Sequence, residues 1–104
     1  MNPKIKAKWV AALRSGEFKQ GTGRLEENGA FCCLGVLAEL CKRATGTDYQ
    51  PYIGLPSRNV VGWAGLDSTD PRVMFEGEPE NLTTLNDDQG LTFPEIATLI
   101  EEQL

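Results

Sequence analysis

The sequence predicts a small α+β fold, in which about three main helices pack on a short antiparallel sheet. Three segments repeat apolar side chains at helical spacing and have residues that start and stop helices at their ends. These segments are residues 3–15, 33–44 and 93–103. The pair Asn28-Gly29 is the strongest hairpin pattern in the chain. A chain of 104 residues suits one core, so residues 1–104 are expected to form a single globular domain.

The first expected helix has clear signals at both ends. Asn2 is a good cap residue, and Pro3 suits the first turn because its missing N–H is not needed there. Gly16 predicts a left-handed stop, with Arg14 near the negative end of the helix dipole. The apolar face consists of Ile5, Trp9, Ala12 and Leu13.

The central part of the chain predicts a hairpin that leads into a buried helix. Strands are expected near 23–27 and 30–32, joined by a type I′ turn. The longest apolar run follows and predicts helix 33–44, which Gly46 stops. Gly35 weakens this helix by about 1 kcal/mol relative to alanine, so it indicates a close crossing by another element.

The second half of the chain predicts shorter elements before the last helix. Ser57 is expected to cap a short helix that ends at Gly65, and residues 70–75 to form a strand. Turns are expected at 77–80 and 86–90, with a single helical turn around Leu82 and Leu85 between them. Thr92 and Glu95 form a capping box, which starts helix 93–103.

Composition excludes several classes of protein. With 40% hydrophobic and 24% charged residues, the chain is neither disordered nor membranous, and no apolar run reaches the roughly 20 residues that a membrane span needs. The N-terminus lacks the apolar region of a signal peptide. Three cysteines, two of them adjacent, fit a disulfide framework poorly, so we expect a reducing cytoplasm.

The net charge of −5 is unevenly distributed along the chain. Residues 1–24 hold six basic side chains and one acidic one, which gives +5, whereas residues 25–104 hold four basic and fourteen acidic side chains, which gives −10. Because only the N-terminal quarter is basic, double-stranded nucleic acid is not an expected partner. A solvated helix face on an acidic protein explains the same pattern.

The residues for catalysis are few. Phe31-Cys32-Cys33-Leu34-Gly35-Val36 superficially resembles the cysteine motif of NlpC/P60-type cell-wall peptidases, which need a histidine as general base. This chain contains no histidine, so we expect its cysteines to be reduced, buried and structural. Three clustered cysteines do not make a zinc site, and Asp87-Asp88 lacks the spaced oxygens of a calcium loop. We therefore expect no cofactor, no metal and no enzymatic activity.

The segment 19–24 is the candidate binding site. Its candidate residues are Lys19, Gly21, Thr22, Gly23 and Arg24. Two glycines let the backbone approach a ligand closely, and two cations flank them, a composition that suits a nest of backbone N–H groups around an anion. The Gly-Lys-Ser/Thr ending of a P-loop is absent. On the residues alone, a plain loop entering a strand is favoured, and the anion-binding nest is the alternative.

Three motifs in the first half resemble a family of small uncharacterised accessory proteins encoded by bacteriophages and prophages. The motifs are Trp9-(three residues)-Leu13-Arg14-Ser15-Gly16, Lys19-Gln20-Gly21-Thr22-Gly23-Arg24-Leu25, and Phe31-Cys32-Cys33-Leu34-Gly35-Val36-Leu37. The tail from Leu82 to Glu101 is similar to that family as well. The resemblance implies an accessory phage protein in the host bacterial cytoplasm, acting against host defence, and it carries over no catalytic residue.

Two functions of different class follow from these patterns. The first is a protein that sequesters a small anionic ligand, such as a nucleotide immune signal, through residues 19–24 and the N-terminal lysines. The second is a protein–protein inhibitor that uses its acidic surface to occupy a basic site on a host or defence protein. A homo-oligomer is compatible with either function.

Overall fold

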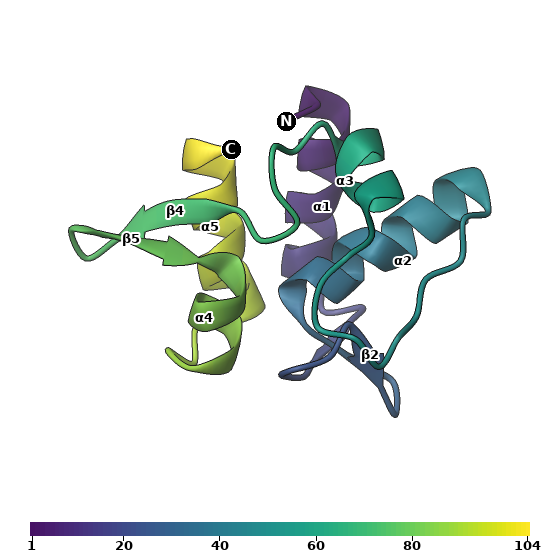
Figure 1. Ribbon diagram of the computed structural model, residues 1–104. Helices are drawn as coiled ribbons and strands as arrows, with labels where there is room; N and C mark the ends of the chain where they lie inside the picture. The colour runs from purple at the N-terminus through teal and green to yellow at the C-terminus, as the bar shows by residue number, and fades with distance from the viewer.

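The computed structural model describes residues 1–104 as an α+β chain with five helices and two small sheets (Figure 1). The helices are α1 (Pro3–Ser15), α2 (Cys33–Thr45), α3 (Arg58–Ala64), α4 (Leu82–Asp87) and α5 (Phe93–Gln103). The strands are β1 (Lys19–Gln20), β2 (Glu26–Glu27), β3 (Ala30–Phe31), β4 (Arg72–Phe75) and β5 (Glu78–Asn81). None of the five helices combines the length and the apolar character that a bilayer crossing requires.

Helices begin and end where their capping residues predict. The Asn2 side chain accepts hydrogen bonds from the first turn of α1, and Gly16 ends that helix with φ of 78°. The capping box of Thr92 and Glu95 is present at the start of α5. The expected bounds of α1 and α5 are confirmed, and α2 runs one residue beyond its expected end, to Thr45.

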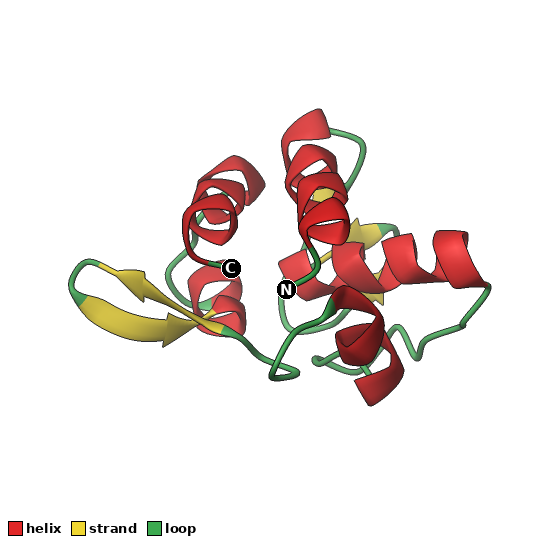
Figure 2. Ribbon diagram, turned by 90° about the horizontal axis from the view of Figure 1, so that it is seen from above, coloured by secondary structure: helices red, strands yellow, loops and turns green.

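The core lies around α1, which packs against both α5 and α2. Helices α1 and α5 lie side by side, and α2 crosses the other side of α1 (Figures 1 and 2). The Trp9 side chain of α1 is fully buried, and its indole Nε1–H donates a 2.9 Å hydrogen bond to the carbonyl of Cys33. This bond satisfies the one polar group of a large buried side chain and joins α1 to the start of α2.

The larger sheet differs from the antiparallel one that the sequence predicts. Its strand order is β1-β3-β2, and β1 pairs with β3 in parallel. Strand β2 pairs with β3 antiparallel, with Glu27 opposite Ala30, and the linking residues Asn28 and Gly29 both have positive φ. The expected strand over 23–27 is wrong in extent, since only Glu26 and Glu27 pair. Residues 23–25 lie in an irregular segment instead.

The turn expected over residues 77–80 is wrong, because residues Glu78–Asn81 form β5, which pairs antiparallel with β4. The chain reverses one residue earlier, at Glu76-Gly77, where φ is 52° and 83°. Positive φ at both positions is the geometry of a type I′ hairpin turn. Pro79 is tolerated within β5 because both strands of a two-stranded sheet are edge strands.

Candidate functional site

Segment 19–24 begins inside the sheet. Lys19 and Gln20 form β1, and the N–H of Gly21 donates to the carbonyl of Phe31 at 2.7 Å. A Cβ at Gly21 would lie 2.9 Å from the Cβ of Ala30, so this close approach to β3 requires glycine. The Gly21 N–H is therefore a sheet donor and is not available to a ligand.

Beyond Gly21 the backbone donors are unpaired. The N–H groups of Thr22, Gly23 and Arg24 make no hydrogen bond within the chain, and all three residues are exposed. Gly23 has φ of 78°, which turns the chain between its neighbours. Successive N–H groups around a left-handed residue are the basis of a backbone anion nest. The segment thus offers three consecutive donors where an anion can reach them.

The two cations of the segment are in different states. Lys19 is exposed and forms no ion pair. Arg24 pairs with Glu27 at 2.9 Å, and the two side chains are 51% and 54% exposed. Because an ion pair this exposed contributes only about 0.2–1 kcal/mol, an incoming anion can compete with Glu27 for Arg24.

The N-terminal lysines lie away from this segment. Lys4, Lys6 and Lys8 are in the first half of α1, whose far end leads into residues 19–24 (Figure 1). At 1.5 Å per residue, Lys6 is roughly 13 Å along the helix axis from Ser15, the last residue of α1. The structure therefore does not bring these lysines to the candidate site.

A buried polar cluster fixes the start of the segment. The Gln20 side chain donates to Asn86 Oδ1 at 3.0 Å and to the Leu91 carbonyl at 2.8 Å. Asn86 is 2% exposed, accepts from the N–H of Cys33 at 3.3 Å and donates to the carbonyl of Gly21 at 2.9 Å. This Gln20–Asn86 cluster ties β1 to α2 and α4. The sequence pattern does not reveal this cluster, because it predicts a turn over residues 86–90, whereas Asn86 lies in the helix α4.

The loop between α2 and α3 runs beside the segment. The N–H groups of Leu25 and Glu26 donate to the carbonyls of Ile53 and Pro51 at 2.8 and 2.9 Å. A Cβ at Gly54 would lie 3.2 Å from the carbonyl oxygen of Gly23. The loop thus lies along the end of the segment, where it is bonded to Leu25 and Glu26 and faces the carbonyl oxygen of Gly23.

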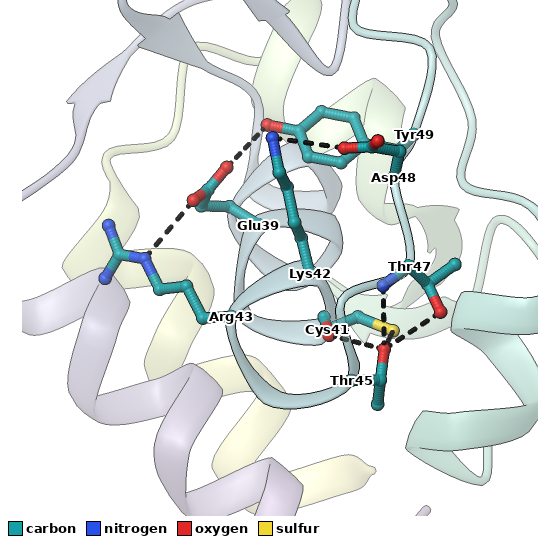
Figure 3. A network of polar contacts seen from close by, with 8 residues as sticks. All are labelled: Glu39, Cys41, Lys42, Arg43, Thr45, Thr47, Asp48 and Tyr49. Carbon is teal, nitrogen blue, oxygen red and sulfur yellow. Dashed lines mark hydrogen bonds and ion pairs between the residues drawn. The ribbon is translucent and has the colours of Figure 1, made fainter.

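A polar network fixes the other end of this loop on α2 (Figure 3). The Glu39 carboxylate accepts from the Tyr49 hydroxyl at 2.9 Å and from Arg43 Nε at 3.2 Å, and Lys42 pairs with Asp48 at 3.2 Å. Burial raises the pKa of Tyr49, and the Glu39 carboxylate raises it further, so the phenol remains a hydrogen-bond donor.

Three cavities lie in the molecule, and none of them is lined by residues 19–24. One, of about 460 Å³, lies between α1 and α5 and is lined by Pro3, Lys6, Ala7, Val10, Ala11, Arg14 and Glu101. A second, of about 420 Å³, has Glu26, Glu39 and Tyr49 in its wall. A third, of about 400 Å³, is lined by residues of α3 and by residues 67–69. No group of three or more histidine, cysteine or carboxylate side chains could hold a metal ion.

The three cysteines are buried and unpaired, as expected. Cys32 caps α2, where its sulfur accepts from the N–H of Gly35 at 3.3 Å. Burial raises the pKa of Cys32, and burial raises the pKa of Cys33 well above its ordinary value. Both thiols are therefore held in the protonated form, which is the poorer nucleophile.

The variant Cys33→Ala is expected to unfold about 1 kcal/mol more easily near neutral pH, through lost packing. In the folded protein the Cys33 thiol stays neutral at pH values above 9.0, the ordinary pKa of a thiol. In the unfolded chain the same thiol ionises there. The stability that it contributes is complete below that pH and is lost as pH rises toward the raised pKa of the folded state.

Between about pH 8 and about pH 10 the native protein should therefore lose ~1 kcal/mol more unfolding free energy than Cys33→Ala. Urea titrations of both proteins at each pH measure the difference. Parallel losses in the two proteins would show that Cys33 ionises in the folded state as readily as in the unfolded chain.

Comparison with known proteins gives the family of this chain. No curated protein and no solved structure matches it. The model of one family, described as a domain of unknown function (DUF8296), matches residues 1–104. The matched region includes the capping residues of α1 and α5, segment 19–24 and the Gln20–Asn86 cluster. The chain therefore belongs to the DUF8296 family.

Proposed function

We propose that the protein is a non-catalytic binding protein that holds a small anionic ligand, through a phosphate group, at residues 19–24. The observation that carries this proposal is the run of unpaired N–H groups at Thr22, Gly23 and Arg24, with a cationic side chain at each end of the segment. Charge-assisted hydrogen bonds from cations and aligned N–H donors are what a phosphate needs once it loses part of its water.

On sequence grounds the donors of the nest are the N–H groups of Gly21, Thr22 and Gly23, and the proposed nest differs in one of the three. Gly21 positions the segment against β3, and its own N–H is bonded to Phe31. The N–H of Arg24 takes its place as the third donor. Arg24 thus contributes both a backbone donor and its guanidinium, and Lys19 adds a second positive charge.

The chemistry of the chain supports binding over catalysis. Histidine is absent from the sequence, and the thiols at the start of α2 are buried with raised pKa values. The resemblance to phage accessory proteins supports a role in the host bacterial cytoplasm, where the protein would sequester a nucleotide immune signal. The proposed ligand class is therefore a phosphate-bearing nucleotide.

Replacing Lys19 and Arg24 together by alanine should weaken binding of nucleotides at least tenfold and leave the melting temperature nearly unchanged, because both side chains are exposed. Binding should also weaken as salt rises, since exposed charges are screened. Isothermal calorimetry against mono-, di- and cyclic nucleotides measures both effects.

The matched control is Lys8→Ala with Arg72→Ala, which removes two exposed cations that form no ion pair. This control has the same net charge as the test variant and should bind like the native protein. Equal binding by the test variant, or no binding of any nucleotide by the native protein, would contradict the proposal.

The second candidate is a protein–protein inhibitor, and the β4–β5 hairpin favours it. Figure 1 shows this hairpin projecting beside α5. Its end carries the exposed carboxylates Glu76 and Glu78, and Met74 on β4 is 51% exposed. An acidic projection with an exposed apolar side chain suits a basic site on a partner protein. Failure of all nucleotides to bind would shift the weight to this function.

A further inference from the structure

We propose that residues 52–55 form an apolar shelf beside the unpaired N–H groups, and that it selects ligands carrying a flat aromatic ring next to their phosphate. This inference rests on the proposed anion-binding function and adds the residues that would recognise the base of a nucleotide. A nucleotide, with both a base and a phosphate, is favoured over a simple phosphate or pyrophosphate ion.

The first step is the exposure of the shelf. Tyr52, Ile53 and Leu55 are 62%, 38% and 40% exposed, and they are three of the four large hydrophobic residues that the chain leaves exposed. All three lie within four consecutive residues, so this part of the loop is a concentration of exposed apolar surface. Such a surface, bordered by polar groups, is typical of a binding site.

The second step is the position of the shelf. The carbonyls of Pro51 and Ile53 accept hydrogen bonds from Glu26 and Leu25, so the loop runs alongside the residues that follow the nest. Backbones joined in this way lie about 5 Å apart, a gap that the sugar of a nucleotide spans. Gly54 lies against the carbonyl of Gly23, and this close approach leaves little room for a side chain at residue 54.

The third step is the rigidity of the shelf. The loop is attached at Tyr49 by the hydrogen bond to Glu39, and at Pro51 and Ile53 by the two backbone bonds. A ligand therefore meets a surface that is already ordered, and binding requires little loss of conformational entropy. Tyr52 lies between the two backbone bonds and offers a ring on which a base stacks, while the phosphate reaches the N–H groups of residues 22–24.

The test compares adenosine diphosphate with inorganic pyrophosphate, which share the diphosphate group and differ in the nucleoside. Because one stacked base commonly adds about tenfold or more in affinity, native protein should bind adenosine diphosphate at least tenfold more tightly. Tyr52→Ala should remove most of that preference without changing the affinity for pyrophosphate. Tyr52→Phe, which keeps the ring, should retain it. Calorimetry with each protein gives the affinities, and a thermal melt checks that each variant is folded.

The outcomes separate the two proposals. Equal affinities for the two probes in the native protein, or a preference that survives in Tyr52→Ala, would overturn the shelf and leave the anion site standing. That result is also the one expected if the exposed apolar residues serve a protein partner instead. Absence of binding by both probes would overturn the shelf, and failure of the mono- and cyclic nucleotides as well would overturn the anion site with it. The anion site is supported if the double variant Lys19→Ala with Arg24→Ala loses affinity for both adenosine diphosphate and pyrophosphate. The shelf is supported if only proteins with an aromatic ring at residue 52 prefer adenosine diphosphate.

Discussion

Replacing Gly35 by alanine is expected to prevent the protein from folding, or to reduce its unfolding free energy by more than about 4 kcal/mol. A Cβ at this position would point directly at the backbone carbonyl of Leu25 and lie 2.6 Å from its carbonyl carbon. The obstacle is backbone and not the end of a flexible side chain, so either α2 or the segment around Leu25 must move. Since small domains are stable by only about 5–15 kcal/mol, a cost of this size removes much or all of the margin.

Gly62→Ala is the matched control, because it makes the same substitution inside α3 with nothing within 4 Å of the new Cβ. There the gain in helix propensity should raise stability by up to about 1 kcal/mol. Far-ultraviolet circular dichroism with urea denaturation measures both variants. A cooperative transition of Gly35→Ala close to that of the native protein would show that the Leu25 carbonyl yields easily and would contradict the prediction.

Replacing Asn86 by alanine should cost about 3 kcal/mol, the second largest effect expected. The side chain is 2% exposed and joins Gln20, Gly21, Cys33 and Asp87 by hydrogen bonds. Its loss leaves the N–H of Cys33 and the carbonyl of Gly21 without this partner, and buried polar groups without partners are expensive.

Asn59→Ala is the control for this effect, because Asn59 is exposed on α3 and its side chain makes no hydrogen bond. It should change stability by less than about 0.5 kcal/mol. Asn86→Ala should also weaken nucleotide binding, since Asn86 holds the carbonyl of Gly21 at the entrance to the candidate site. If Asn86→Ala is as stable as Asn59→Ala, water replaces the hydrogen bonds of the Asn86 side chain without cost, and the prediction is wrong.

The helices could be predicted from the sequence because their signals are local. A cap, an apolar stripe and a stop glycine lie within a few residues of one another, so α1 and α5 follow from short windows of sequence. Gly35 could be predicted as a close crossing for a similar reason, since a glycine inside a buried helix needs an explanation. The identity of the crossing element, the carbonyl of Leu25, depends on tertiary structure.

The strands and the polar cluster depend on partners distant in the sequence. Strand β1 has only two residues, and nothing in Lys19-Gln20 shows that β3 lies alongside. Strand β5 contains Pro79 and charged residues, which favour a turn until β4 is known to lie opposite. Asn86 looks like a turn residue because its burial is decided by Gln20, 66 residues earlier.

Only the outline of the candidate site can be predicted from the sequence. The glycines and cations of segment 19–24 are visible in the chain, but the loss of the Gly21 N–H to β3 is not. The shelf at residues 52–55 is a turn-rich stretch on sequence grounds. Its relation to Gly23 appears only when the loop is placed beside that segment.

The last turn of α5 has a consequence for how the molecule opens. Gln103 accepts from the N–H of Met74 at 2.6 Å and donates to the carbonyl of Met74 at 2.9 Å, so its side-chain amide occupies the edge of β4 as a neighbouring strand would. On the opposite side of α5, Arg14 of α1 pairs with Glu101 at 3.2 Å. Local unfolding of α5 therefore uncovers β4 and the side of α1 at once. The amides of α1, α5 and the hairpin should accordingly exchange with solvent deuterium as one cooperative unit.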